Sequence, residues 1–347
     1  TGGGPTMSAT TRAAVYRGRG RLDVTEVDLP AVGPSDVLVE VAYCGVCGTD
    51  LHNVIDGWGI PDSIGGHEWS GRVVAVGDDA PIEVGTLVVG SGRSPCGDCA
   101  SCRAGRSGLC SERGPVGTEK VYGAFADHLV IDAAETLPVP DGVDARSAAY
   151  AEPLAVALHA LTLAAPRPDE RVLVSGCGPI GAAVVAVLVA RGHADLLVVE
   201  PADLRRDLAS RLGATTCHPD DLETPWHPGF TVDQPANVVL ETSGVRAAAE
   251  ACLGQLAGCG RLVLVGTGLD FPRLDTGRII LNELVVTGAY NYDEHGFEAA
   301  LDLIASGSLP LDLLLESDAV GLDGLLEAMV RLRAGEVAGK VLVRPRA

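Results

Sequence analysis

The chain has 347 residues with 46 acidic and 26 basic side chains, so its formal charge is 26 − 46 = −20 at pH 7. This length exceeds that of one compact domain, so two domains are expected, and the negative charge makes nucleic acids and anionic membrane surfaces poor partners. No apolar run reaches the roughly 20 residues that span a bilayer, and no secretory signal is recognised, so we expect a cytoplasmic protein.

The first part of the chain predicts short β-strands. Runs rich in β-branched residues, bounded by Gly, Pro or Asp, occur at 36–41, 71–77 and 86–89. Such strands are typical of a small, irregular antiparallel barrel. Residues 1–6, which precede Met7, are left out of the fold prediction.

From about residue 141 the pattern changes to alternating strands and helices. We expect helices at 145–163, 180–191, 204–212, 298–305 and 322–333, and strands at 171–175, 195–200, 237–241, 261–265 and 283–287. Continuously apolar strands that alternate with helices indicate a parallel sheet covered on both faces, and therefore an α/β fold.

Three segments carry side chains suited to a reactive metal site: CGTDLH (47–52), GHEWSG (66–71) and AEPL (151–154). Cys47, His67 and a carboxylate form a mixed S/N/O set that suits zinc and keeps one coordination position open. Taken singly, each is more often a core cysteine, a structural histidine or a loop carboxylate. Thr49 and His52 offer a hydroxyl and an imidazole that can pass a proton to solvent.

A second cysteine group has the spacing of a closed zinc site. Cys96, Cys99, Cys102 and Cys110 fall within fifteen residues, and four thiolates can complete a tetrahedron around a structural zinc ion. A disulfide pair or free thiols are the alternatives, and the expected cytoplasmic setting and the spacing argue against both. The cysteines that occur singly are interpreted as packing residues: Cys177, Cys217, Cys252 and Cys259.

The segment GCGPIG matches the glycine-rich turn of dinucleotide-binding proteins. Its residues are Gly176, Cys177, Gly178, Pro179, Ile180 and Gly181, between a predicted strand and a predicted helix. The next strand ends at Glu200, whose carboxylate would accept hydrogen bonds from ribose hydroxyls and repel a 2′-phosphate. NAD is therefore favoured over NADP, although Arg205 and Arg206 stand close enough in sequence to hold such a phosphate.

Together, CGTDLH, GHEWSG, the cysteine group, EPLAVALH, GCGPIG and the closing GKVLV resemble the medium-chain zinc-dependent alcohol and polyol dehydrogenases, from about Met7 onward. The resemblance implies two lobes. A GroES-like catalytic domain would comprise 1–155 and 296–347, with a structural zinc loop at 92–115, and a doubly wound Rossmann domain would comprise 156–295. It also implies two zinc ions per chain and a homodimer or homotetramer.

The resemblance further implies roles for individual residues. Cys47, His67 and Glu68 would bind the catalytic zinc, with Glu152 as a fourth ligand, directly or through water, and the proton relay would pass from Thr49 through the cofactor ribose to His52. Further cofactor residues would be Val265, Gly266, Thr267, Ala289, Tyr290 and Asn291. Substrate-wall candidates are Asn53, Trp58, Asn291 and Tyr292.

The expected reaction is hydride transfer between NAD and a secondary alcohol, which gives the ketone. Asn53 and Asn291 stand where the sorbitol enzymes carry Tyr and Arg, so another polyol, a diol, an aminocyclitol or a hydroxy amino acid is expected in place of sorbitol. The alternatives are a primary-alcohol dehydrogenase of the same family, an inactive NAD-binding relative, a zinc-free quinone or enoyl reductase, and a purely structural zinc protein.

Overall fold

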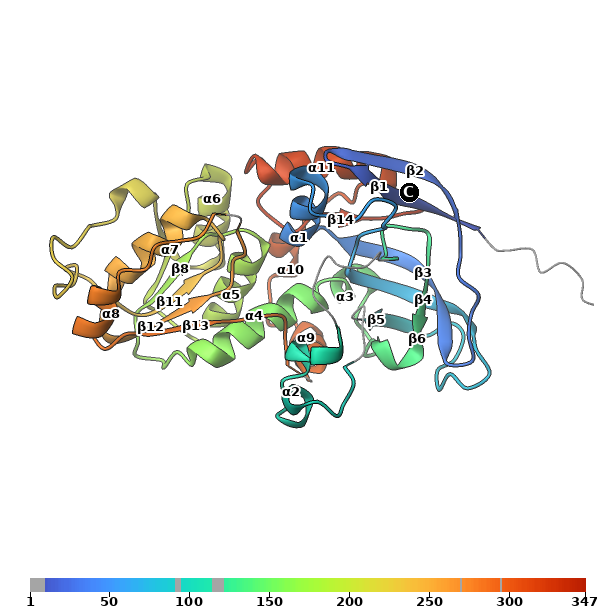
Figure 1. Cartoon of the computed structure of the whole chain (residues 1–347), viewed down its shortest axis with the longest axis horizontal. Helices are drawn as coiled ribbons and strands as arrows, with labels where there is room; N and C mark the ends of the chain where they lie inside the picture. Colours follow the sequence, from blue (N-terminus) through green and yellow to red (C-terminus); the bar gives the residue numbers. More distant parts are fainter. Residues whose placement is uncertain (1–9, 91–94, 114–121, 269, 294) are drawn as a thin grey trace, which may run out of the picture.

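The computed structural model describes residues 10–90, 95–113, 122–268, 270–293 and 295–347. Two sheets lie beside each other, a parallel sheet on the left of Figure 1 and an antiparallel, barrel-like sheet on the right. The excluded residues 1–6 and the ends of the predicted zinc loop, 92–94 and 114–115, lie outside the described residues. No helix in the described part of the chain is long and apolar enough to cross a membrane.

The parallel sheet has the strand order β10-β9-β8-β11-β12-β13 within the described residues. Its strands are β8 (Val172–Ser175), β9 (Leu196–Val199), β10 (Thr215–Cys217), β11 (Ala236–Glu241), β12 (Leu256–Leu264) and β13 (Val285–Gly288). The chain starts in the middle at β8, builds outward to β10, and then returns to build the other half from β11. This doubly wound order confirms the predicted α/β sheet and places its ligand crevice beside β8 and β11.

Both faces of this sheet are covered, as the continuous apolar strands predict. Val172 and Val174 of β8 pack into one core cluster, whereas Leu173 between them packs into another on the opposite face. This alternation follows from the two-residue period of a strand. The surrounding helices are α4 (Ala151–Ala164), α5 (Pro179–Ala190), α6 (Asp203–Leu212), α7 (Arg246–Cys252), α8 (Thr276–Leu281) and α9 (Gly296–Ala305), with short turns η5 (Pro219–Asp221) and η6 (Leu253–Gln255).

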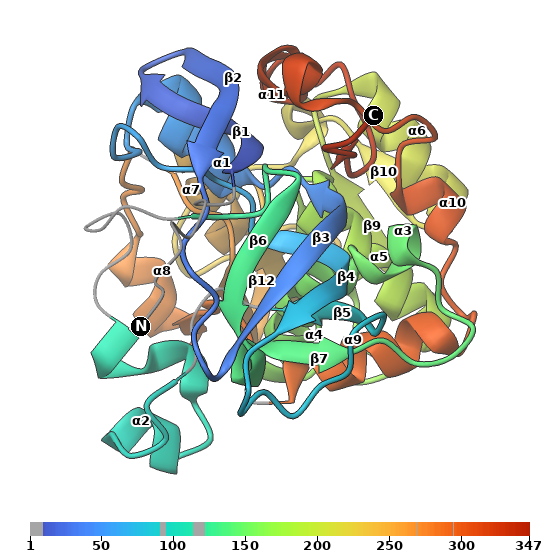
Figure 2. The same ribbon diagram turned by 90° about the vertical axis from the view of Figure 1, so that its right-hand side faces the viewer.

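The antiparallel part faces the viewer in Figure 2. Its main sheet runs β14-β3-β4-β5-β7, β6 pairs with β3, and β1 and β2 form a hairpin. The strands are β1 (Thr10–Gly18), β2 (Arg21–Asp28), β3 (Asp36–Gly45), β4 (Glu68–Val76), β5 (Leu87–Gly90), β6 (His128–Asp132), β7 (Thr136–Pro138) and β14 (Leu342–Val343).

Short helical segments connect these strands. They are α1 (Gly48–Leu51), η1 (His52–Asp56), α2 (Ala100–Arg103), η2 (Ser107–Leu109), η3 (Ser111–Arg113), η4 (Ala133–Glu135), α3 (Ala145–Ala148), α10 (Leu311–Leu314), η7 (Leu322–Gly324) and α11 (Leu325–Arg333). Leu325, Met329 and Leu332 of α11 lie in the barrel core. The end of the chain therefore packs with its beginning, although the predicted domain boundaries themselves stay a prediction.

The helix predicted at 145–163 is in fact two helices, α3 and α4. Tyr150 is the N-cap of α4, and Pro153 falls in the first turn of that helix. A proline is tolerated there because the first-turn N–H groups have no acceptor within the helix, but it cannot sit in a helix interior. The break turns the chain so that α4 begins beside the barrel and runs under the parallel sheet.

Candidate active site

Cys47, His67 and Glu68 come together where the barrel meets the parallel sheet. Cys47 caps α1 directly after β3, and His67 and Glu68 stand at the start of β4. One ligand atom from each residue lies within 4.8 Å of the others. Sulfur, imidazole nitrogen and carboxylate oxygen are donors that zinc accepts in reactive sites, so the side chains present fit such an ion.

Asp50 supports two members of this cluster and was missed in the sequence analysis. Its buried carboxylate accepts a hydrogen bond from the backbone N–H of Cys47 at 2.9 Å, and it lies 3.9 Å from Nδ1 of His67. Burial raises the pKa of Asp50, while His67 opposes that rise. Asp50 thus restrains the backbone at Cys47 and places a carboxylate beside the imidazole of His67.

Glu68 is already paired within the protein. Nζ of Lys340 lies 2.6 and 2.7 Å from the two carboxylate oxygens, and it also donates to the backbone carbonyl of Val46 at 3.1 Å. The side chains of Glu68 and Lys340 are 0% and 1% exposed. A metal ion in this cluster would therefore compete with Lys340 for Glu68, and the role of Glu68 as a ligand stays a prediction.

Lys340 was also missed, although the sequence carries a signal. The chain contains only two lysines, Lys120 and Lys340, among 26 basic residues. Gly45 was missed as well. A Cβ at this position would lie 2.1 Å from Oε2 of Glu68 and would collide with its carboxylate. The backbone of β3 thus leaves the space that the Glu68 carboxylate occupies.

Glu152, in the first turn of α4, stands beside the cluster without joining the three donors. Burial raises its pKa to about 7; His67 and Lys340 oppose the rise, and Glu68 and Asp50 add to it. Burial disfavours the imidazolium of His67, yet Cys47, Asp50 and Glu152 raise the pKa of His67. The site therefore concentrates anionic groups in a small volume and favours a cation at its centre.

Thr49 and His52 extend from the cluster toward the parallel sheet. Oγ1 of Thr49 lies 3.7 Å from Sγ of Cys47. The ring of His52 stacks on Trp58 with 4.9 Å between centroids, and its Nε2 lies 3.1 Å from the carbonyl oxygen of Thr267 after β12. The predicted relay residue thus bridges the two parts of the molecule.

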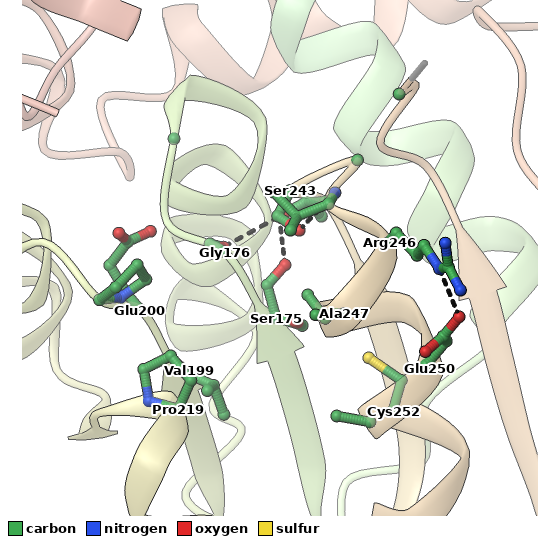
Figure 3. A pocket seen from close by; sticks show the side chains of 18 of the residues that line it. Ser175, Gly176, Val199, Glu200, Pro219, Ser243, Arg246, Ala247, Glu250 and Cys252 are labelled. Carbon is green, nitrogen blue, oxygen red and sulfur yellow. Dashed lines mark hydrogen bonds and ion pairs between the residues drawn. The ribbon is translucent and has the colours of Figure 1, made fainter. Parts of the chain in front are cut away.

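A cavity of about 1250 Å³ begins at Cys47 and His52 and continues along the carboxyl edge of the parallel sheet. Figure 3 shows Gly176, Glu200 and Ser243 in its wall. Of the predicted cofactor residues, it is lined by Gly176, Gly178, Pro179, Glu200, Arg205 and Thr267. The remaining ones and the substrate candidates are not among the residues that line this cavity: Ile180, Gly181, Val265, Gly266, Ala289, Tyr290, Asn291, Asn53, Trp58 and Tyr292.

The glycine turn has the shape that a pyrophosphate requires. Gly176 has φ +91°, and a Cβ on Gly181 would lie 2.1 Å from the carbonyl oxygen of Gly176. Gly178 caps α5, and a Cβ there would meet nothing within 4 Å. An open N-terminal helix end with free N–H groups is the usual cradle for a dinucleotide phosphate.

This geometry separates two substitutions in the same turn. We expect Gly178→Ala to leave the free energy of unfolding unchanged but to weaken NADH binding about tenfold or more, because its methyl group occupies the phosphate cradle. Gly181→Ala is expected to destabilise the fold by about 1–3 kcal/mol, because α5 must move away from the turn. Urea unfolding and a fluorescence titration with NADH measure both effects. Unchanged NADH affinity in Gly178→Ala would contradict the assignment of the turn.

Glu200 and the two nearby arginines are held by hydrogen bonds. The carboxylate oxygens of Glu200 accept from the backbone N–H groups of Cys177 and Ala202 at 2.7 and 2.9 Å. Arg205 donates to backbone carbonyls next to α11, at Leu332 (2.9 Å) and Val337 (3.2 Å).

Arg206 is engaged in the same way. It donates to the carbonyls of Glu200 and Pro201, both at 2.6 Å, and pairs with Asp203. Both arginines that were candidates for a 2′-phosphate therefore have protein partners.

The loops after β12 and β13 lie against other parts of the molecule. A Cβ on Gly266 would lie 2.1 Å from the backbone nitrogen of Gly244, and one on Gly108 would lie 2.8 Å from the carbonyl oxygen of Tyr292. The cysteine-rich lobe, residues 95–113, therefore packs directly on the segment that follows β13. In that segment Asn291 adopts φ +52°.

The cysteine group is also assembled. The sulfur atoms of Cys96, Cys99, Cys102 and Cys110 all lie within 4.8 Å of one another. Hydrogen bonds from the backbone N–H groups of Cys102 and Ser111 lower the pKa of the Cys99 thiol to about 6. Four thiols that converge in this way fit a tetrathiolate metal site.

A group of polar side chains lies between this lobe and the core and was likewise missed. Asp293 lies 3.2 Å from Nε of Arg106 in the lobe and 2.9 Å from Nδ1 of His159 on α4. His159 is the last residue of the EPLAVALH motif. Its partner lies more than a hundred residues away in sequence, which is why the motif alone did not reveal the contact.

Comparisons with known proteins agree with this arrangement. Residues 33–141 match the model described as alcohol dehydrogenase GroES-like domain, and residues 179–306 match the one described as zinc-binding dehydrogenase. The 2-dehydro-3-deoxy-L-galactonate 5-dehydrogenase of Pseudoalteromonas atlantica is 35% identical over 312 residues, which are 88% of this chain and 90% of that protein. The L-threonine 3-dehydrogenase of Pyrococcus abyssi is 34% identical over 343 residues, 92% and 94% of the two chains.

A solved structure has the same fold along nearly the whole chain. It is a protein of Sinorhizobium meliloti 1021, described as a zinc-binding dehydrogenase and bound to NADP. Its TM-score is 0.84 at 26% identity, and the match covers 97% of this chain and 100% of that one. The predicted two-part architecture, with a GroES-like part and a dinucleotide-binding sheet, is confirmed.

Proposed function

The chain belongs to the medium-chain zinc-dependent alcohol and polyol dehydrogenase family, and we propose that it transfers hydride between NAD and a secondary alcohol to give the ketone. One observation carries the proposal: Cys47, which clusters with His67 and Glu68, lines the same cavity as the glycine turn. A metal-binding donor set and a dinucleotide cradle that share one cavity are what this reaction needs.

The residues of the chain then have separate tasks. When bound, zinc supplies a Lewis acid that makes the alcohol hydroxyl easier to ionise, and the nicotinamide ring of NAD accepts the hydride. Cys47, His67 and Glu68, with Glu152 nearby, would hold the metal, and Asp50 keeps Cys47 and His67 in place. Thr49 would take the hydroxyl proton, and His52 would release it to solvent. Cys96, Cys99, Cys102 and Cys110 would hold a second, structural zinc.

NAD is proposed over NADP. Glu200 presents a carboxylate in the cavity wall where the ribose hydroxyls would bind. Both nearby arginines are occupied, Arg205 by backbone carbonyls and Arg206 by carbonyls and Asp203. A 2′-phosphate would therefore meet a negative charge and no free cation among these described residues.

The proposed substrate carries more than one polar group. The two curated relatives are named for a sugar acid and for threonine, each oxidised at a secondary alcohol. Asn53, Asn291 and Tyr292 would supply the polar contacts and Trp58 an apolar wall, so a polyol, a diol, an aminocyclitol or a hydroxy amino acid is expected. We also propose a homodimer or homotetramer, which light scattering would test.

The deciding experiment combines metal analysis with a substrate screen. We expect about two zinc ions per chain, and NADH formation with members of the four substrate classes when NAD is supplied, with much less turnover when NADP replaces it. Activity confined to primary aliphatic alcohols would support a primary-alcohol dehydrogenase. NADH binding without turnover on any alcohol would support an inactive relative, and either result would overturn the proposal.

A further inference from the structure

Both ring nitrogens of His52 face hydrogen-bond acceptors. Nδ1 lies 2.7 Å from Oδ2 of Asp56, one turn further along η1, and Nε2 lies 3.1 Å from the carbonyl oxygen of Thr267. The indole of Trp58 stacks on the imidazole with 20° between the planes, which restrains rotation of the ring. His52 is thus held at three points.

Asp56 is itself fixed by a residue from the far end of the chain. Arg333, at the end of α11, donates from both terminal nitrogens to the two carboxylate oxygens of Asp56, at 3.0 and 2.7 Å. This two-bond geometry sets the plane of the carboxylate as well as its position. Hydrogen bonds from Arg333, and then from His52, lower the pKa of Asp56 to about 2 against the opposing effect of burial.

An ionised Asp56 decides which nitrogen of His52 carries a proton. A carboxylate can only accept a hydrogen bond, so Nδ1 must be the donor in that contact. The carbonyl of Thr267 also only accepts, but it is uncharged and further away, and hydrogen bonds to a charged acceptor are the stronger ones. In the neutral ring the proton therefore stays on Nδ1, and Nε2 is the nitrogen that gains and loses protons.

We propose that Asp56 and Arg333 form a positioning pair that assigns proton exchange in the relay to Nε2 of His52. The inference rests on the proposed function, because His52 has a relay role only if an alcohol is oxidised in this site. His52, Asp56, Arg333 and Thr267, whose carbonyl oxygen is next to Nε2, all help to line the cavity. With the cofactor bound, Nε2 would accept the proton that the relay delivers and would then release a proton to solvent, so no net charge would accumulate on the ring.

Other charged groups of the described residues lie near this pair. From α6, Arg205 donates to the carbonyl of Leu332, next to Arg333, at 2.9 Å. Asp56 of η1 faces His52, and Arg333 of α11 faces Asp56. From the turn between β1 and β2, Arg19 donates to the carbonyl of Ile55 at 3.2 Å, on the same short helix. The loop after β12 contributes the uncharged carbonyl of Thr267.

The first test reads the tautomer directly and needs no activity. The chain has eight histidines, whose ring signals appear in a long-range ¹H–¹⁵N spectrum of the ¹⁵N-labelled protein. The signal that disappears in His52→Gln identifies His52. At alkaline pH, where the ring is neutral, we expect the Nδ1–H tautomer in the wild type and a shift toward Nε2–H in Asp56→Ala. A wild-type ring in the Nε2–H form would overturn the proposal.

The second test is the pH profile of alcohol oxidation. Arg333→Met and Asp56→Asn are expected to lower kcat about tenfold, with KM for NAD and alcohol within about twofold. In Asp56→Asn the pH profile of kcat is also expected to change, because a neutral amide replaces the charged acceptor that faces Nδ1 of His52. Arg331→Met is the matched control on the same helix, since Arg331 pairs only loosely with Glu336 at 3.8 Å, with both side chains more than half exposed.

The outcomes separate this inference from the proposed function. If no alcohol is oxidised, the proposed function fails, while the tautomer spectrum still supports or overturns the pairing. A raised KM for NAD in Arg333→Met with an unchanged pH profile would assign Arg333 to cofactor binding and overturn the positioning role. If Arg331→Met and Arg333→Met lowered kcat equally, a loss of helix stability would explain both effects. The positioning role of Arg333 would then be overturned as well.

Discussion

Replacing Cys47 by serine is expected to lower turnover about a thousandfold or more while NADH affinity stays within about twofold of the wild type. Sulfur is the soft donor of the cluster with His67 and Glu68, and a serine hydroxyl is a poor replacement for a thiolate at zinc. Loss of a Lewis acid removes several kcal/mol of transition-state stabilisation, and about 4 kcal/mol corresponds to a thousandfold. Cofactor affinity should persist, because the glycine turn and Glu200 lie in the parallel-sheet part of the chain and keep their contacts.

Steady-state kinetics, NADH fluorescence titration and metal analysis together check this result. The zinc content should fall by about one per chain, because the cysteine group at 96–110 is untouched. Cys44→Ala is the matched control: Cys44 is a buried thiol three residues earlier that lies outside the donor cluster. Wild-type turnover in Cys47→Ser would show that the reactive cluster is assigned wrongly.

Much of the fold could be predicted because it depends on local patterns. The strands expected at 171–175 and 195–200 and the helix expected at 204–212 lie within one residue of β8, β9 and α6. Their apolar runs and stop signals, such as Gly213 in the left-handed conformation after α6, act over a few residues. The start of β12 could not be predicted in the same way, because its first half, residues 256–260, contains two glycines that are typical of a loop.

In the candidate site, too, local features could be predicted and long-range contacts could not. Motifs located Cys47, His67, the cysteine group and the glycine turn, because each donor set is encoded within a short segment. The contacts that govern those residues join distant parts of the chain: Lys340 reaches Glu68 across 272 positions, and Arg333 reaches Asp56 across 277. No period or spacing in the sequence encodes such pairs, because they form only when the C-terminal segment packs against the barrel.

The second large effect concerns Lys340. We expect Lys340→Met to lower the free energy of unfolding by about 3–5 kcal/mol, because it leaves the Glu68 carboxylate buried without a cation. The double variant Glu68→Gln, Lys340→Met should recover much of that loss, since neither side chain then carries a charge. Urea unfolding followed by the fluorescence of the buried Trp69, next to Glu68, measures the change. Arg346→Ala is the control: Arg346 pairs with Glu40 at the surface, where loss of a pair costs about 1 kcal/mol or less.

The pH dependence of this effect has a definite sign. Burial works against the charged amine, yet Glu68 and Cys47 raise the pKa of Lys340 above the 10.5 of a free lysine. A raised folded-state pKa means that the stabilisation is complete below about pH 10.5 and is lost as the pH rises through the higher value. The wild type and Lys340→Met should therefore differ fully at neutral pH and converge in strong alkali.

Zinc adds a final discrimination for the same variant. Without Lys340, the Glu68 carboxylate is free to turn fully to a metal ion held by Cys47 and His67, and a ligand that binds only the folded state raises its stability by mass action. Added zinc should therefore restore part of the stability lost in Lys340→Met, and restore less in the double variant, where Glu68→Gln has replaced the carboxylate by a neutral amide. If added zinc restored the stability of both variants equally, Glu68 would pair with Lys340 only and would not be a ligand of the metal.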